Sequence, residues 1–194
     1  MLLLLFCELF PAPNRNLNYH NLLEPFDRRA SPAVFAFGKL RDAMMTDPLA
    51  SKISTQLVLP SQVSAELRDL AGINYPLEAC GLLLGHFSDG AVKASRVVRA
   101  RNLNHDRPHD RYLLDPADFV AADRAARGDG LEIIGIWHTH PNSPAVPSAT
   151  DLEAAWSGYS YLIVAVSSSG ETDMRSWRLE EDRFTEENIQ QEDL

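Results

Sequence analysis

The sequence predicts a mixed α/β domain in which helices flank a central sheet. Short apolar runs at 79–85, 131–137 and 160–167 have the length of buried strands. The segments between them carry apolar residues at helical spacing, so strands and helices alternate along the chain. Hydrophobic residues make up 45% of the chain and charged residues 23%, a balance that is typical of soluble globular domains.

The first clear element is a helix that starts at Ser61, a residue type that caps helix N-termini, and ends at Gly72. An apolar strand follows Glu78, and a turn at 88–90 leads into an antiparallel strand at 92–98. The residues at helical spacing on the buried face of the helix are Val63, Leu67, Leu70 and Ala71.

Beyond a polar loop at 102–111, residues 112–114 predict a brief strand. Asp115 followed by Pro116 predicts the cap and the first residue of a second helix, which ends at 128–130. Its buried face consists of Phe119, Ala122 and Ala126. The remaining predicted elements are a strand at 131–137, a proline-rich loop at 141–147, a helix at 148–156, and strands at 160–167 and 173–179.

We expect one domain over residues 52–180. Residues 1–51 contain prolines and asparagines without strand or helix periodicity, which predicts a poorly ordered N-terminal extension with no part in the chemistry. Met44 and Met45 near its end leave open that the native start lies there. The acidic C-terminal tail, residues 181–194, is expected to be frayed or to form a surface helix.

The formal charge of −9 argues against nucleic acid or an anionic membrane surface as the partner. Two cysteines, Cys7 and Cys80, are too few for a disulfide framework, so we expect a cytoplasmic protein. The apolar opening of the chain meets Glu8 and has no basic segment before it, which disfavours a secretory signal. No apolar run reaches the roughly 20 residues of a membrane-spanning helix, and the oligomeric state stays open.

The most informative segment is His138-Thr139-His140, at the end of a predicted strand. Alternate side chains of an extended chain share a face, so His138 and His140 point the same way, with Cα atoms roughly 6.5 Å apart. Two such imidazoles can bind one ion at about 2.0–2.1 Å. Taken alone, a His-x-His pair is more often two surface or core histidines.

Ser148 and Asp151 stand at the start of a predicted helix, where Ser-x-x-Asp is also the pattern of a capping box. At this spacing the two side chains are neighbours, so Asp151 can be a third ligand as well as a cap residue. Two histidines, one carboxylate and an open fourth position make up a catalytic zinc site. Glu78 is a candidate base for the hydrolytic water, or else a solvated residue at a strand edge.

Glu78, His138-Thr139-His140-Pro141, Ser148 and Asp151 together resemble the JAMM motif of the MPN-plus (Mov34/MPN/PAD-like) metallopeptidases. The flanking segments Glu78–Gly85, Tyr112–Pro116 and Gly135–Trp137 are similar as well, and the resemblance covers about residues 55–180. It implies a fold like that of cytidine deaminases, although their His-x-Glu signature is absent. It further implies one Zn²⁺ per chain bound by His138, His140 and Asp151, with Glu78 as general base and acid and Ser148 as donor to the oxyanion.

Few residues separate Glu78 from His138 along the sequence, and in this the chain is similar to compact bacterial members of the family. The resemblance thus implies hydrolysis of a peptide or isopeptide bond at the C-terminal tail of a small ubiquitin-like or sulfur-carrier protein. We expect that tail to pair with the sheet near residues 103–114. The rival hypothesis is a catalytically silent MPN module that acts as a scaffold. Such modules usually lose ligands, whereas the set is complete here.

Four polar residues of the loop have an ordinary interpretation beside a functional one. His105 and His109 suggest a second metal site, but a solvated loop is the commoner case. Arg107 and Arg111 are able to meet a substrate carboxylate, though surface arginines are common.

Cys80 is the candidate nucleophile of a third hypothesis, a cysteine hydrolase. Its apolar neighbours instead favour a buried, inert thiol. Trp137 and Trp156 are expected to lie in the core or in a pocket wall.

Overall fold

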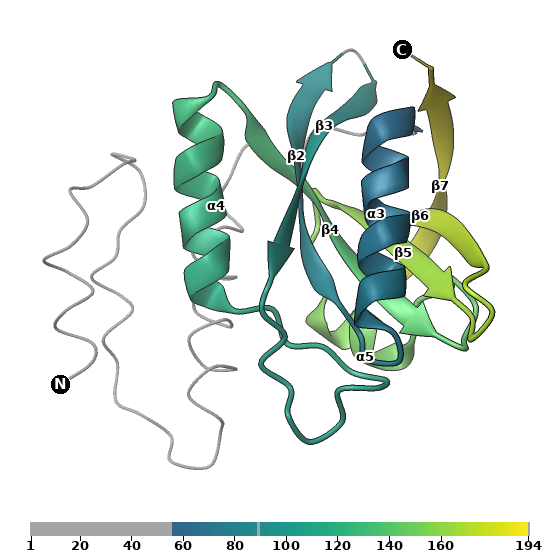
Figure 1. Ribbon diagram of the computed structural model, residues 1–194. Helices are drawn as coiled ribbons and strands as arrows, with labels where there is room; N and C mark the ends of the chain where they lie inside the picture. Colours follow the sequence, from purple (N-terminus) through teal and green to yellow (C-terminus); the bar gives the residue numbers. More distant parts are fainter. Residues whose placement is uncertain (1–55, 89, 194) are drawn as a thin grey trace, which may run out of the picture. The chain divides into compact units, whose positions relative to one another are not determined.

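The computed structural model describes residues 56–88 and 90–193. Three helices and seven strands make up this part of the chain (Figure 1). The helices are α3 (Ser61–Asn74), α4 (Pro116–Gly128) and α5 (Ala149–Ala154). The strands are β1 (Gln56–Pro60), β2 (Cys80–Ser88), β3 (Ala91–Ala100), β4 (Glu132–Pro141), β5 (Ser160–Val166), β6 (Thr172–Glu180) and β7 (Arg183–Glu192). The predicted N-terminal extension, residues 1–51, lies outside the described residues.

The strands form one closed sheet in the order β1-β3-β2-β4-β5-β6-β7. β1 closes it because it pairs in parallel with both β3 and β7. The prediction of a mixed α/β fold is confirmed, but the expected central sheet is a closed barrel. The two strands that close it, β1 and β7, are both missing from the sequence-based prediction.

β7 corrects the expectation of a frayed end or a surface helix for the acidic C-terminal segment. It pairs antiparallel with β6 and parallel with β1, so residues 183–192 are an integral part of the sheet. The sequence concealed this strand because its one fully buried position is a glutamate, Glu187, instead of an apolar residue. Its side chain is accommodated by a hydrogen bond from Ser176 at 2.7 Å.

α3 has the predicted buried face, with Val63, Leu67 and Ala71 in the core. Its ends differ from the prediction. Pro60 occupies the N-cap position without a side-chain hydrogen bond, and the helix continues past Gly72 to Asn74. The Ser61 hydroxyl instead has two acceptors, the Asp193 carboxylate at 2.7 Å and the Glu192 carbonyl at 3.2 Å, and so ties the helix start to the end of β7.

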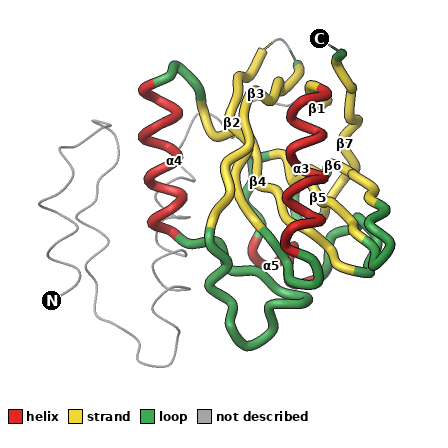
Figure 2. The backbone as a smooth tube through the Cα atoms, in the orientation of Figure 1, coloured by secondary structure: helices red, strands yellow, loops and turns green. Residues whose placement is uncertain are grey.

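α4 agrees with the prediction in its cap and its buried face. The Asp115 side chain accepts a hydrogen bond from the Ala117 amide at 2.7 Å, and Pro116 is the first helical residue. The long loop before α4 (green in Figure 2) contains no strand at 112–114, because only the single bridge between Asn102 and Leu114 forms there.

Among the described residues, no helix is long and apolar enough to span a membrane.

Candidate metal centre

β4 carries both histidines and lies between two strands. β2 pairs with it antiparallel and β5 parallel, and the β5 pairing runs from Gly135 to Pro141. The His138 side chain is fully buried and that of His140 is nearly so, with 0% and 8% of the residue exposed. Their Nε2 atoms lie 3.0 Å apart. The His138 backbone is therefore fixed on two sides, and the His140 backbone is fixed by its pairing with Ala165 of β5.

Asp151 reaches the same point from the first turn of α5. Its Oδ1 lies 3.5 Å from His138 Nε2, and its Oδ2 lies 3.7 Å from His140 Nε2. A full capping box orients the carboxylate: the Ser148 amide donates to Asp151 Oδ2 at 2.6 Å, and the Asp151 amide donates to Ser148 Oγ at 3.2 Å. The capping interpretation of this motif is thus confirmed, and the same geometry leaves Asp151 close enough to both histidines to be a ligand as well.

The separations of these side-chain atoms suit a single tetrahedral cation. Zinc bonds of about 2.0–2.1 Å at tetrahedral angles place ligand atoms about 3.3–3.5 Å from one another. The two Nε2 atoms are 3.0 Å apart, and the Asp151 carboxylate lies 3.5 Å from His138 through Oδ1 and 3.7 Å from His140 through Oδ2. With one atom taken from each residue, all three lie within 4.8 Å of one another. His140 Nδ1 lies 2.8 Å from the Pro144 carbonyl oxygen. It must donate there, since a carbonyl oxygen only accepts, and this leaves Nε2 as the ligand atom in the neutral ring.

Burial and mutual contacts set the charge of these residues. Burial lowers the pKa of His138 and keeps it neutral, which is the form that binds metal. Burial acts against the charged form of Asp151, but hydrogen bonds to His138 and His140 outweigh it and hold the pKa well below the usual range. Burial also opposes the charged form of His140, and contacts with Asp151 and the Pro144 carbonyl raise its pKa on balance.

Glu78 lies on the same face as the histidines. Cys80 stands opposite His138 in the β2–β4 register. The Thr139 amide donates to the Ala79 carbonyl at 2.9 Å, which carries the pairing one residue further and brings Glu78 beside His140. Only 7% of Glu78 is exposed. Burial raises its pKa to about 7, with a smaller opposing effect of His140 and a further increase from Asp151.

Three supporting residues escaped the sequence analysis. The Tyr112 ring stacks on the His138 imidazole with centroids 4.5 Å apart. Thr139 points away from the metal ligands and accepts a hydrogen bond from the Ala79 amide at 2.8 Å through its Oγ1. Pro144 contributes its carbonyl to His140. The Thr139 role follows from strand alternation. Tyr112 comes from a loop that is distant in sequence, and Pro144 acts through its backbone carbonyl in the loop after β4, so neither leaves a periodic signal.

The other candidate residues stay outside this group. Within the described segments, His138, His140 and Asp151 form the one set of this kind, and it does not include His105 or His109. His109 Nδ1 lies 3.1 Å from the Pro76 carbonyl oxygen, and Arg107 pairs with Asp110.

Cys80 is buried, and burial raises the pKa of its thiol to about 12, which disfavours a thiolate nucleophile. Its Sγ donates weakly to the Arg101 carbonyl oxygen at 3.8 Å. Trp137 and Trp156 are core residues, as expected.

A buried His-His-Asp group with a carboxylic acid beside it, on a mixed α/β fold, defines a protein with a candidate mononuclear metal centre. Residues 60–180 match the family of prokaryotic homologs of the JAB domain, and the chain belongs to this family. The resemblance to JAMM metallopeptidases that the motif indicated is thereby confirmed.

Named relatives have peptidase activities. The chain is 34% identical over 135 residues to the desampylase of Haloferax volcanii, which covers 69% of this chain and 94% of the relative. It is 28% identical over 117 residues to the CysO-cysteine peptidase of Mycobacterium tuberculosis, covering 60% and 77%. The solution structure of a protein from Desulfitobacterium hafniense superimposes with a TM-score of 0.65 at 29% identity, covering 71% of this chain and 94% of that one.

Proposed function

We propose that this protein is a zinc metallopeptidase that hydrolyses a peptide or isopeptide bond at the C-terminal tail of a small ubiquitin-like or sulfur-carrier protein. The observation that carries the proposal is the convergence of His138, His140 and Asp151 within 4.8 Å of one another. Three protein ligands leave one position for water or substrate, which is the arrangement of catalytic zinc sites.

The three ligands would hold one Zn²⁺, which supplies Lewis acidity toward the water and the scissile carbonyl. Glu78 accepts a proton from the attacking water while the water oxygen forms a bond to the carbonyl carbon. It then donates that proton to the leaving nitrogen as the carbon–nitrogen bond breaks. Burial raises the pKa of Glu78 to about 7 in the metal-free protein, and a bound cation would favour the ionised form that accepts the proton.

Ser148 is proposed as the donor to the oxygen that becomes negative in the tetrahedral intermediate. Its Oγ accepts a hydrogen bond from the Asp151 amide at 3.2 Å, so the hydroxyl hydrogen remains available to donate. The same contact fixes the position of the oxygen beside the metal ligands. Removal of one such donor typically costs about 10²–10³-fold in kcat.

The substrate class rests on the relatives and on the loop that precedes α4. A desampylase and a CysO-cysteine peptidase both align with this chain across most of their own length. The substrate tail is proposed to lie in extended form along residues 103–114, beside the segment in which Leu103 donates to Leu113 at 2.8 Å.

Four finer points belong to the same proposal. The catalytic domain is proposed to begin near residue 52 and, with β7 included, to extend past the predicted boundary at 180. Its barrel is proposed to be a variant of the fold that cytidine deaminases share with JAMM peptidases. A cytoplasmic location is proposed on the small number of cysteines.

The decisive experiment uses Glu78→Gln, with Glu66→Gln on the exposed side of α3 as the matched control. Candidate carrier proteins are incubated with each purified variant, and the products are read by intact mass. We expect Glu78→Gln to keep zinc and lose about 10²–10⁴-fold in turnover, whereas Glu66→Gln acts like the wild type. Wild-type rates from Glu78→Gln would remove this residue from the mechanism. Wild-type protein that takes up no zinc and cleaves no carrier would favour the silent scaffold.

A further inference from the structure

The Asn102 side chain is the junction of the loop that borders the site. Its Nδ2 donates to the Glu78 and Arg111 carbonyl oxygens, each at 3.1 Å. Its Oδ1 accepts from the Asn104 amide at 2.9 Å and from the Leu113 amide at 3.0 Å. A primary amide has two donor hydrogens and two acceptor lone pairs. All four are thus engaged, and every partner is a backbone group.

Glu78 itself lies before the first residue of β2 and needs other contacts to fix its backbone. Its amide donates to the Pro108 carbonyl oxygen at 2.7 Å, and its carbonyl accepts from Asn102. Both backbone groups of Glu78 are therefore bonded to the loop of residues 102–113. The direction in which the Glu78 side chain leaves the backbone depends on these two bonds.

The two bonds differ in what a substitution can remove. The Pro108 contact is a backbone bond that survives a change of side chain, whereas the Asn102 contact depends on one amide nitrogen. Asn102 also holds Arg111 and Leu113, the residues that return the loop toward α4. Without this amide, the loop and the Glu78 carbonyl lose their shared anchor. Small misplacements of a catalytic group are costly, since about 1 Å can reduce a rate about 10²-fold.

We propose that Asn102 is a positioning residue: it holds the backbone of Glu78 so that the carboxylate reaches the water and the leaving nitrogen. The inference rests on the proposed peptidase function, because it assigns Asn102 a role through the proposed general base. It predicts a loss of kcat beyond any rise in KM: the loop that Asn102 also anchors is the proposed tail site, whereas the bond to the Glu78 carbonyl acts on the general base.

The first test compares Asn102→Ala and Asn102→Asp with Asn104→Ala. Asn104 is the matched control because its Oδ1 stabilises the same loop, through the Arg107 amide at 3.0 Å, without touching Glu78. Asn102→Asp keeps the acceptor and the shape but loses both donor hydrogens. We expect both Asn102 variants to keep full zinc content and to lose about 10–100-fold in kcat. Asn104 lies in the segment proposed for the substrate tail, so Asn104→Ala is expected to act on KM and to change kcat by less than about twofold. Equal losses of kcat in the two Asn102 variants and in Asn104→Ala would overturn the proposal.

The second test is a double-mutant cycle with Glu78→Gln. If Asn102 acts through Glu78, Asn102→Ala has little further effect once the carboxylate is gone, and the two losses are strongly non-additive. A purely structural role would instead multiply the two losses, and that result would overturn the inference. Thermal melting of each variant checks folding, and Asn102→Asp serves if Asn102→Ala does not fold. Absence of cleavage by the wild type would refute the peptidase function itself, which is a different result from an unaltered Asn102 variant.

Discussion

Two clusters of buried polar side chains lie in this fold, and they differ in how their charges are balanced. The histidine cluster consists of His138, His140 and Asp151. The arginine cluster consists of Ser160, Ser176, Arg178 and Glu187, and spans β5, β6 and β7. All seven residues are buried. A buried charge is costly unless it is paired and hydrogen-bonded, so each cluster has to supply a partner.

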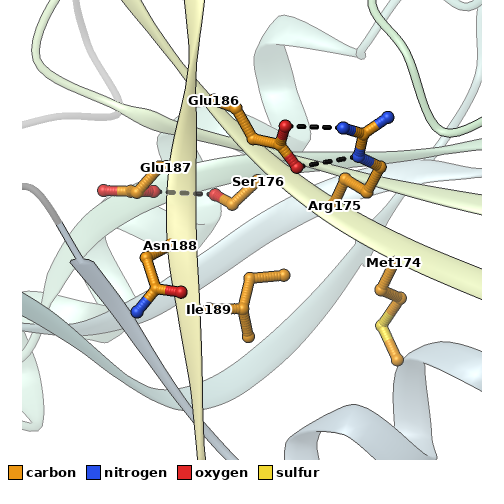
Figure 3. A pocket seen from close by; sticks show the side chains of 7 residues that line it. All are labelled: Met174, Arg175, Ser176, Glu186, Glu187, Asn188 and Ile189. Carbon is orange, nitrogen blue, oxygen red and sulfur yellow. Dashed lines mark hydrogen bonds and ion pairs between the residues drawn. The ribbon is translucent and has the colours of Figure 1, made fainter.

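The arginine cluster contains its own cation. Arg178 Nη1 lies 3.4 Å from Glu187 Oε1 and 3.4 Å from Ser160 Oγ. Figure 3 shows the bond from Ser176 to Glu187 beside the separate, exposed pair of Arg175 and Glu186, along a surface pocket of about 390 Å³. Burial raises the pKa of Glu187, and its contacts with Ser176, Ser160 and Arg178 offset part of this effect. The cluster is thus a structural element of the barrel.

The histidine cluster contains no cation that balances its carboxylate. In the segments that the structure describes, Asp151 pairs with two histidines and with no arginine or lysine. Moreover, the Nε2 atoms of the two imidazoles face each other at 3.0 Å. A cation from outside the chain would satisfy these three side chains at once. One cluster thus contains its own balancing charge, whereas the other is the one proposed to bind a cation.

The largest expected effect separates the clusters by metal content. His138→Ala removes one of three proposed ligands and is expected to weaken zinc binding more than about 100-fold, since loss of even an outer hydrogen-bond partner costs about 10–100-fold. Activity is expected to fall to background as the metal is lost. Arg178→Met is expected to keep one zinc per chain. Elemental analysis of both purified variants checks this, and equal zinc in the two would break the comparison.

Arg178→Met is expected to destabilise the fold by about 3–5 kcal/mol, because it leaves Glu187 buried without its cation. The matched control is Arg175→Met, which removes the exposed pair with Glu186 and is expected to cost about 1 kcal/mol or less. Urea unfolding at constant zinc concentration measures both. The double variant Arg178→Met/Glu187→Met should regain much of the loss. A cost for Arg178→Met no greater than that for Arg175→Met would show that the arginine cluster is not structural.

The smallest expected effect concerns pH and the metal-free protein. Burial raises the pKa of Glu78 from 4.5 to about 7. A raised pKa means that the folded state favours the protonated acid, so this contribution to stability is complete below pH 4.5 and is lost as pH rises through 7. Glu78→Gln cannot ionise and escapes the loss. With chelator present, its melting temperature relative to the wild type should rise by about 5–10 °C between pH 5 and pH 8, equivalent to about 2–3 kcal/mol.

Zinc provides the control for that measurement. A cation close to Glu78 favours the ionised carboxylate, so the difference between variant and wild type should change less with pH when zinc is bound. A difference that is constant with pH in the metal-free protein would contradict the raised pKa. A difference that falls as the pH rises would mean that the pKa of Glu78 is lowered instead of raised.

Local patterns predicted most of the fold. The buried face of α4, its Asp115 cap and the strand pair β2–β3 follow from residue spacing, and each is present. The predictions failed where stability comes from distant partners. β7 depends on pairing with β1, more than a hundred residues away in the sequence, and on a glutamate held by Ser176. Ser61 has the residue type of a cap, yet its hydroxyl bonds to the chain end instead.

The sequence by itself determined the ligand types and their local geometry: alternation along a strand puts His138 and His140 on one face, and the first turn of a helix puts Asp151 next to Ser148. Only the tertiary structure decided that these two segments meet at one point, and that the β2–β4 register brings Glu78 beside His140. The physical reason is the separation along the chain of the residues that interact. Side-chain direction follows from a few neighbouring dihedral angles, whereas convergence depends on strand pairing and loop bonds between residues far apart in the chain.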